Sequence, residues 1–238
     1  MRRGWLLFLA AVLLGCSSDD GRVTVMAASS LAEVMDHFDD DIDDDNIDGV
    51  SVITAGSSVL VSQLAAGADG DILITADADS MNRAIEQGLV KGKPSVIAQN
   101  RLVLAVATGN PGGVESLNDL SRKELLVGLC AEEVPCGALS AQALDRAGVE
   151  VSADTYESSV RALRTKIALG ELDVGLVYAT DAQALDLQTV AVPELNNFTN
   201  DYYIASIVPN PPSSVQTFLS LFLSRGMQHL DAAGFVTK

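Results

Sequence analysis

At Met26-Ala27-Ala28-Ser29-Ser30-Leu31, a segment rich in β-branched residues gives way to a helical pattern. The preceding residues, Arg22–Ala27, have the composition of a strand. Apolar residues recur at the three-to-four spacing of a helix in Leu31–Phe38. The same junction returns at Thr54-Ala55-Gly56-Ser57-Ser58-Val59, so a strand, small residues, a Ser-Ser pair and a helix form a unit that occurs twice.

Strand and helix patterns alternate along the rest of the chain. This alternation predicts an α/β fold with mostly parallel sheets. In such sheets ligands bind beyond the carboxyl ends of the strands, which is where the two junctions lie. The predicted strands are Arg22–Ala27, Val50–Thr54, Asp71–Thr75, Leu102–Ala107, Leu125–Cys130, Val174–Tyr178, Thr189–Val192 and Tyr202–Val208, and the predicted helices are Leu31–Phe38, Val59–Ala66, Met81–Gln87, Ala138–Ala147, Val160–Leu169 and Val215–Leu223.

The composition is that of a globular protein. The chain has 238 residues, which predicts one large domain or two small lobes. Its 48% apolar and 20% charged residues exclude the disordered and coiled-coil classes. A formal net charge of −17, without a cluster of Lys and Arg, argues against a nucleic-acid partner.

Residues 1–15 have the pattern of a signal peptide. Two arginines precede an apolar run, Trp5–Leu14, that is too short to span a membrane. Leu13-Leu14-Gly15-Cys16 resembles a bacterial lipobox, which implies cleavage before Cys16, a lipid on its thiol and a tether over residues 16–21. The alternative is an ordinary secretory signal with an incidental cysteine. Both place the mature protein outside the cytoplasm.

The Ser-Ser junctions have two interpretations. Ser30 and Glu33 fit the capping-box spacing S-x-x-E, which by itself predicts only a well-capped helix. The alternative is that the Ser30 hydroxyl and the free N–H groups of the first helical turn face a bound anion. Because Ser57 and Ser58 offer the same donors at the second junction, anion binding is favoured.

Three later segments also place donors at the ends of elements. Two of them, Val134-Pro135-Cys136-Gly137 and Glu157-Ser158-Ser159-Val160-Arg161, are helix starts. The third, Gly175–Asp181, ends a strand at Tyr178. A tyrosine can donate a hydrogen bond while its ring excludes water, although Tyr178 taken alone is better explained as an aromatic residue at a rim.

The acidic segment at residues 39–48 invites comparison with a calcium loop. It lacks the terminal Glu and the correctly placed Gly of the EF-hand pattern. A solvated turn between a helix and a strand is the favoured interpretation.

Together these stretches resemble the molybdate-binding protein of bacterial ABC importers, over nearly the whole chain from Arg22 to Lys238. Gly70–Asp77 and Ala233–Lys238 belong to the same resemblance. It implies a two-lobed α/β receptor with the type II periplasmic-binding-protein fold, in which each lobe is a mostly parallel sheet flanked by helices. Lobe 1 would comprise residues 22–100 and 194–238, and lobe 2 residues 101–193.

The resemblance also implies a function. The receptor would enclose a tetrahedral oxyanion, molybdate or tungstate, in the cleft between the lobes and deliver it to the permease and ATPase of an ABC importer. It would be an extracytoplasmic monomer attached to the membrane through a lipid at Cys16, with no enzymatic activity and no cofactor. Molybdenum would enter only within the oxyanion, without a direct protein ligand.

The resemblance carries over to particular residues. Ser30 and Ser57 would donate through their hydroxyls, Cys136 and Val160 through their backbone N–H groups, and Tyr178 through its phenol. Ser29 and Ser58 are further candidates. The sequence departs from the family at Cys136, where the family usually has Ala. Cys130 lies six residues earlier, and the two cysteines could form a disulfide or remain free thiols, because sequence does not determine the Cα separation that a bridge requires.

Other functions remain open at this stage. A receptor of the same fold could bind sulfate, phosphate or a small carboxylate. An extracytoplasmic hydrolase could use Ser or Cys136 as its nucleophile, but the chain contains no G-x-S-x-G elbow, P-loop or H-E-x-x-H motif. A purely structural surface lipoprotein would leave the recurring donors at helix starts unexplained.

Overall fold

A computed structural model describes residues 21–42, 47 and 49–238. The predicted signal peptide at residues 1–15, the lipidated Cys16 and all of the tether except Gly21 lie outside the described residues. Within the described ranges, no helix combines the length and the apolar character that a membrane crossing requires.

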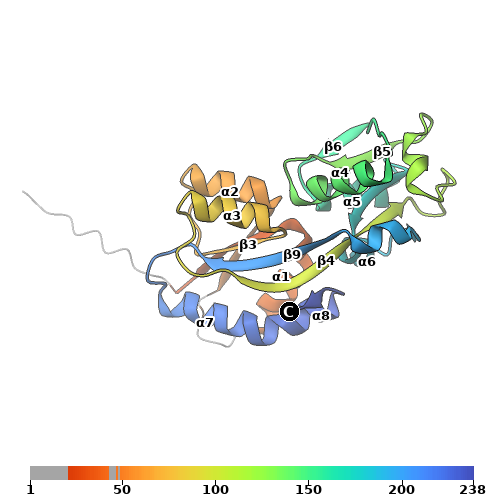
Figure 1. Cartoon of the computed structure of the whole chain (residues 1–238). Coiled ribbons are helices and arrows are strands. Elements are labelled where there is room, and N and C mark those ends of the chain that lie inside the picture. Colours follow the sequence, from red (N-terminus) through yellow and green to blue (C-terminus); the bar gives the residue numbers. More distant parts are fainter. Residues whose placement is uncertain (1–20, 43–46, 48) are drawn as a thin grey trace, which may run out of the picture.

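The strands pair in the order β2-β1-β3-β9-β4-β7-β5-β6, with β8 and β10 also paired to β4 (Figure 1). Pairing is parallel among β1, β2 and β3 and among β5, β6 and β7, whereas β9 and β4 pair antiparallel with their neighbours. The parallel pairing that alternation predicts is therefore present at both ends, and two long antiparallel strands connect them. The bounds are β1 Val23–Ala28, β2 Val50–Ala55, β3 Ile72–Thr75, β4 Ser95–Val106, β5 Val127–Cys130, β6 Thr155–Glu157, β7 Val174–Tyr178, β8 Gln188–Val190, β9 Thr199–Ser206 and β10 Val236–Thr237.

Helices cover the sheet at both ends. Figure 1 shows α2 and α3 above one end and α7 and α8 below it, whereas α4, α5 and α6 gather around the other end. A 3-10 turn, η1 (Ser29–Leu31), precedes α1. The helices are α1 Ala32–Asp41, α2 Ser57–Ala65, α3 Ala78–Glu86, α4 Pro135–Ala147, α5 Val160–Ala168, α6 Ala179–Ala184, α7 Ser213–Leu221 and α8 Met227–Ala232.

The hydrophobic core divides between the two ends. One large cluster packs α1 and α7 against β1 and contains Phe38 and Phe218. The other large cluster packs α5 against β7 and contains Leu163 and Leu176. A smaller third cluster packs α2 and α3 on the sheet beside the first and contains Leu60 and Met81. Strand β4 contributes to both large clusters, with Ile97 in the first cluster and Leu102 to Val106 in the second. The two cores are thus physically connected through one continuous strand.

The structure differs from the predicted elements in identifiable places. The predicted strand Leu102–Ala107 is the second half of β4, which begins seven residues earlier. Its first half contains the polar residues Gln99, Asn100 and Arg101, which interrupt the apolar pattern where the strand passes between the cores. After α7, a π-helical segment, Phe222–Gly226, leads directly into α8, which sequence patterning did not predict.

The acidic segment is partly helical. Helix α1 extends to Asp41, three residues beyond the predicted helix end at Phe38. Residues 43–46 and 48 lie outside the described residues. Among the described residues, no group of three or more His, Cys, Asp or Glu side chains is arranged to hold a metal ion.

Candidate functional site

A pocket lies where the starts of η1, α2, α4 and α5 meet the end of β7. It contains six of the seven predicted ligand-binding residues, and Ser58 is the one that does not line it. No lining residue in the described part of the chain has a charged side chain. The lining residues are Ala28, Ser29, Ser30, Gly56, Ser57, Ala76, Val134, Pro135, Cys136, Ser159, Val160 and Tyr178.

The helix starts give the pocket its polarity. The first N–H groups of a helix have no partner within the helix, and the helix dipole adds partial positive charge there. Helix α4 begins with Pro135, which has no N–H, so Cys136 supplies the first N–H group of that helix. In α5, Ser159 accepts a hydrogen bond from Ala162 N–H at 3.2 Å and leaves the N–H of Val160 unused by the cap. Helix starts of this kind attract anions.

Ser57 is oriented by a bond from outside its helix. Its hydroxyl oxygen accepts a hydrogen bond from the backbone N–H of Ala76 at 2.9 Å, and both groups are buried. The hydroxyl hydrogen is therefore available to donate. The preceding residue, Gly56, allows the α2 start to approach the opposite wall, because an added Cβ would lie 2.6 Å from Ser158 O and 2.9 Å from Val134 Cγ1.

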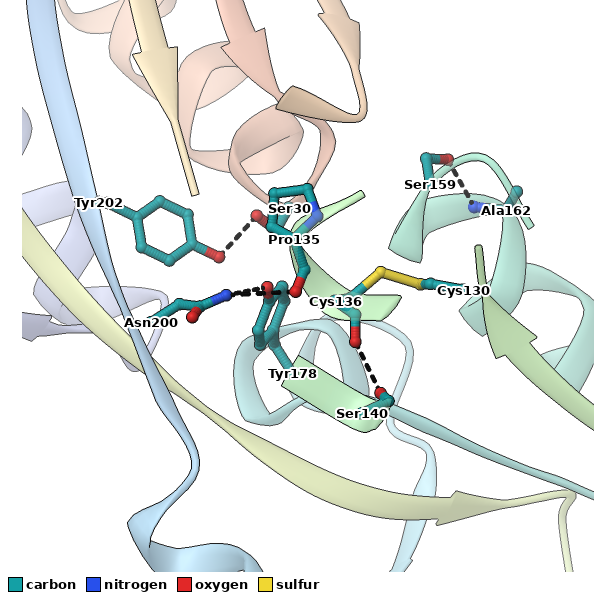
Figure 2. The surroundings of a disulfide bond; sticks show 10 residues. All are labelled: Ser30, Cys130, Pro135, Cys136, Ser140, Ser159, Ala162, Tyr178, Asn200 and Tyr202. Carbon is teal, nitrogen blue, oxygen red and sulfur yellow. Dashed lines mark hydrogen bonds between the residues drawn. A yellow bond between two sulfur atoms is a disulfide. The ribbon is translucent and has the colours of Figure 1, made fainter. Parts of the chain in front are cut away.

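Ser30 has a partner that sequence patterning did not indicate. Its hydroxyl lies 2.8 Å from the hydroxyl of Tyr202 on β9 (Figure 2). Neither η1 nor α1 has a side-chain cap bond. The capping-box interpretation of Ser30 and Glu33 is therefore wrong. The local cap does not form because both side chains have partners elsewhere in the fold. Ser30 contacts Tyr202, and Glu33 forms an ion pair with Arg164.

The environment of Tyr178 leaves its phenolic hydrogen available to donate a hydrogen bond. Its phenolic oxygen accepts a hydrogen bond from Asn200 Nδ2 at 2.8 Å (Figure 2). Burial raises the pKa of Tyr178 well above its ordinary value, and the nearby Tyr202 hydroxyl acts in the same direction. The phenol therefore remains protonated at neutral pH and has a hydrogen to donate. Burial also raises the pKa of Tyr202.

A disulfide joins Cys130, at the end of β5, to Cys136, in the first turn of α4, with a Cα separation of 5.8 Å. Because its sulfur is part of the disulfide, Cys136 has no free thiol to act as a nucleophile. The residue contributes its backbone to the pocket. The intervening loop is tightly packed, because an added Cβ on Gly137 would lie 1.8 Å from Ala131 O. Ser140 Oγ donates to Cys136 O at 2.6 Å (Figure 2).

Charged residues lie behind the pocket. Arg164 forms an ion pair with Glu33, and its Nη1 lies 3.2 Å from Asp181 Oδ1. Burial opposes ionisation of Glu33, but the hydrogen bond and charge of Arg164 outweigh it and lower its pKa. Burial raises the pKa of Asp181 to about 7, although Arg164 acts in the opposite direction. The four nearest helix starts, and not these side chains, face the pocket.

The pocket suits a small, fully ionised anion. The centre of a water-sized sphere can move through about 10 Å³ of it, close to what a single water requires. Any larger ligand, whether a tetrahedral oxyanion, an amino acid or a sugar, therefore enters only if the walls move apart, and an oxyanion requires the least movement. The donors are neutral, and a hydrogen bond that involves one ionised partner is about twice as strong as a neutral one.

Sequence patterning missed Asn200 and Tyr202, which orient two of the donors. The only available signal was the general rule that a buried tyrosine finds a partner for its hydroxyl. That rule does not say which residue the partner is, and Ser30 is separated from Tyr202 by 172 positions.

Comparison with known proteins supports a receptor. The chain matches the family described as bacterial extracellular solute-binding protein over residues 23–236. It is 33% identical over 219 residues to the molybdate-binding protein ModA of Mycobacterium tuberculosis H37Rv, covering 90% of this chain and 84% of that protein.

Solved structures share the fold. The periplasmic molybdate-binding protein of Azotobacter vinelandii superposes with a TM-score of 0.74 at 17% identity, covering 90% of this chain and 98% of that one. The sulfate-binding protein SubI of M. tuberculosis H37Rv gives a TM-score of 0.70 at 18% identity, covering 90% and 86%. The predicted fold class is confirmed, and a fold shared by molybdate and sulfate receptors does not by itself select the oxyanion.

Proposed function

The chain belongs to the bacterial extracellular solute-binding protein family, and from this premise we propose that its pocket binds molybdate, and tungstate as well, for delivery to an ABC importer. Proteins of this family bind solutes and are not enzymes. The observation that carries the proposal is the convergence of neutral donors on one small pocket. Sequence identity to ModA of M. tuberculosis supports molybdate as the ligand.

The donor set consists of the hydroxyls of Ser30 and Ser57, the N–H groups of Cys136 and Val160, and the phenol of Tyr178. Such a set favours an oxyanion without its own hydrogen, because a protonated phosphate finds no acceptor among donors. It also selects by size, since metal–oxygen bonds in molybdate and tungstate are longer than the bonds in sulfate. Ser29 lines the pocket and is a secondary candidate, whereas the position of Ser58 supports it less.

The proposed mechanism is closure of two lobes on the ligand. Lobe 1 would comprise residues 22–100 and 194–238, and lobe 2 residues 101–193. The division of the core supports this assignment, since one large cluster lies wholly within the first set of residues and the other lies within the second set except for Leu195. Ligand that touches both lobes favours the closed form. The closed receptor, as a monomer, would be recognised by the permease, and the ATPase would drive transport.

Thermal unfolding with molybdate, tungstate, sulfate or phosphate tests the ligand. A ligand at 100 times its Kd adds about 2.7 kcal/mol of stability. We expect molybdate and tungstate alone to raise the Tm, by roughly 5–10 °C for a chain of this size. A rise in Tm with sulfate or phosphate alone would show that this anion is the ligand instead of molybdate, and the proposal of a receptor would stand. No rise with any of the four anions would contradict the proposal.

Attachment through a lipid at Cys16 is tested separately. The full chain and its Cys16→Ala variant are expressed in a bacterium and partitioned between detergent and water. We expect the parent in the detergent phase and the variant in the aqueous phase. An aqueous parent would show that the leader is an ordinary secretory signal.

A further inference from the structure

Arg164 is a buried arginine that connects the two cores. Its side chain is 2% exposed, and its helix, α5, packs in the core of β5–β7. Glu33, its ion-pair partner, lies on α1, which packs in the core of β1–β3. Asp181, its other neighbour, is fully buried and lies on α6, the helix that directly follows β7. The guanidinium therefore has one carboxylate from each side.

Donors of the pocket lie at or just before the starts of the same three helices. Glu33 lies one helical turn after Ser30, Arg164 one turn after Val160, and Asp181 one turn after Tyr178. A change in the distance between Glu33 and Arg164 therefore changes the distance between Ser30 and Val160. The two sides of the pocket are mechanically linked through this ion pair.

We propose that Arg164 is a positioning residue, whose ion pair with Glu33 forms when the lobes close and thereby stabilises the closed, anion-bound receptor. This inference rests on the proposed function of the pocket. Asp181 accompanies Arg164 on the same side and stays beside its guanidinium in the open form. Glu33 supplies the contact that differs between the forms, and only such a difference shifts an equilibrium.

The geometry gives the two carboxylates different roles. Both oxygens of Asp181, and Arg164 Nε and Nη1, are buried without a well-aligned hydrogen bond among the described residues. Removal of Asp181 would leave a buried charge without its neighbour, and such a variant is expected to unfold easily. Glu33 is 36% exposed, so its change to Gln leaves a group that water can reach. Glu33→Gln is therefore the informative variant.

The chain offers a matched control on the same helix. Lys166 of α5 forms an ion pair with Glu157 at 2.6 Å, and both residues lie on the β5–β7 side. Lys166→Gln removes an ion pair from α5 without affecting a contact between the two cores. Both variants change one charge to a neutral amide.

The experiment measures molybdate affinity by calorimetry, the Tm without ligand, and the radius of gyration at saturating molybdate. We expect Glu33→Gln to weaken affinity roughly tenfold, which corresponds to the loss of one charge-assisted hydrogen bond. Its radius of gyration with molybdate should exceed that of the parent. Its Tm without ligand should match the parent, and Lys166→Gln should bind as the parent does. Arg164→Lys should also bind more weakly, because an ammonium group lacks the guanidinium fork.

The possible failures are distinguishable. Parental affinity in Glu33→Gln would overturn the positioning role and leave the proposed function intact. If Glu33→Gln lowered the stability of the free and the molybdate-bound forms equally, the Glu33–Arg164 ion pair would exist in both forms, and the positioning role would be overturned as well. Absence of molybdate binding by the parent would instead remove the proposed function.

Discussion

Asn200 donates a hydrogen bond to the phenolic oxygen of Tyr178 at 2.8 Å. The two residues come from β9 and β7, which are separated in the sheet by β4. Because the phenolic oxygen is already an acceptor, its hydrogen points to a different partner. Asn200 thus sets the direction in which Tyr178 donates.

Reversal of this bond should weaken binding. In Asn200→Asp, the new carboxylate would accept the phenolic hydrogen and place a negative charge near the pocket. We expect at least about a tenfold loss of molybdate affinity, from one lost donor bond to an ion. Tyr178→Phe should give a loss of similar size. Calorimetric titration measures both, and parental affinity in both variants would remove Tyr178 from the donor set.

The serine hydroxyls should each contribute measurably. Ser30→Ala and Ser57→Ala remove one donor each, and each should weaken molybdate binding by about 1.5–3 kcal/mol. Ser62→Ala is the control, because Ser62 Oγ donates to Ser58 O within α2 and does not line the pocket. The prediction fails if Ser62→Ala weakens binding as much as Ser57→Ala.

Gly56 should be required for closure. Its replacement by Ala would place Cβ 2.6 Å from the backbone oxygen of Ser158, so the walls of the pocket would have to separate. We expect weaker molybdate binding with little change in the Tm of the free protein. Gly92→Ala is a suitable control, since an added Cβ there has nothing within 4 Å. Parental affinity in Gly56→Ala would show that the walls adapt.

The disulfide should stabilise both the fold and the site. It closes a short loop between Cys130 and Cys136, and a loop of this length corresponds to about 2 kcal/mol in the chain-entropy view. We expect the double variant Cys130→Ala/Cys136→Ala to unfold at lower denaturant and to bind molybdate less tightly, because the Cys136 N–H is no longer held in place. Denaturant titrations and calorimetry measure the two effects. Unchanged affinity would mean that packing at Gly137 holds the N–H group without the bridge.

Asp181 should make stability depend on pH. Its folded pKa of about 7 lies above the ordinary value of 3.8, so between these values the folded state holds a proton that the unfolded state has released. The contribution of Asp181 to the free energy of unfolding therefore falls as pH rises from about 4 to about 7, by up to about 1.4 kcal/mol per pH unit. Above about pH 7 the fall ends, because both states are then ionised.

Asp181→Asn tests this linkage. The variant has no titrating group at this position, so the difference between parent and variant should change with pH in that window and be constant above it. Chemical unfolding at pH 5, 6, 7 and 8 measures the difference. A difference that is independent of pH would show that Arg164 keeps Asp181 ionised throughout.

Local sequence patterns predicted the parts of the site that are themselves local. Ser30, Ser57, Cys136 and Val160 lie at strand-to-helix or loop-to-helix junctions, and each junction is visible within six residues. The resemblance to a known family then assigned the donor roles of the Cys136 and Val160 N–H groups and added the phenol of Tyr178. The alternation of strands and helices likewise predicted the class of fold.

Local sequence patterns did not predict the contacts between distant segments. Glu33 fits a capping box by spacing, yet it pairs with Arg164, 131 positions away. Polar residues at Gln99–Arg101 concealed the first half of β4, because that half lies between the cores and lacks an apolar pattern. These features depend on which elements meet, and that is decided by the packing of the whole chain.

The position of β9 has a consequence for biogenesis. This strand lies between β3 and β4, although it begins 93 residues after the end of β4 and 124 residues after the end of β3. Until β9 is in place, the facing edges of β3 and β4 have unpaired backbone groups, and exposed edges of this kind promote aggregation. A nascent chain that emerges from the export machinery must therefore keep these edges apart from other chains until the segment near its carboxyl terminus arrives.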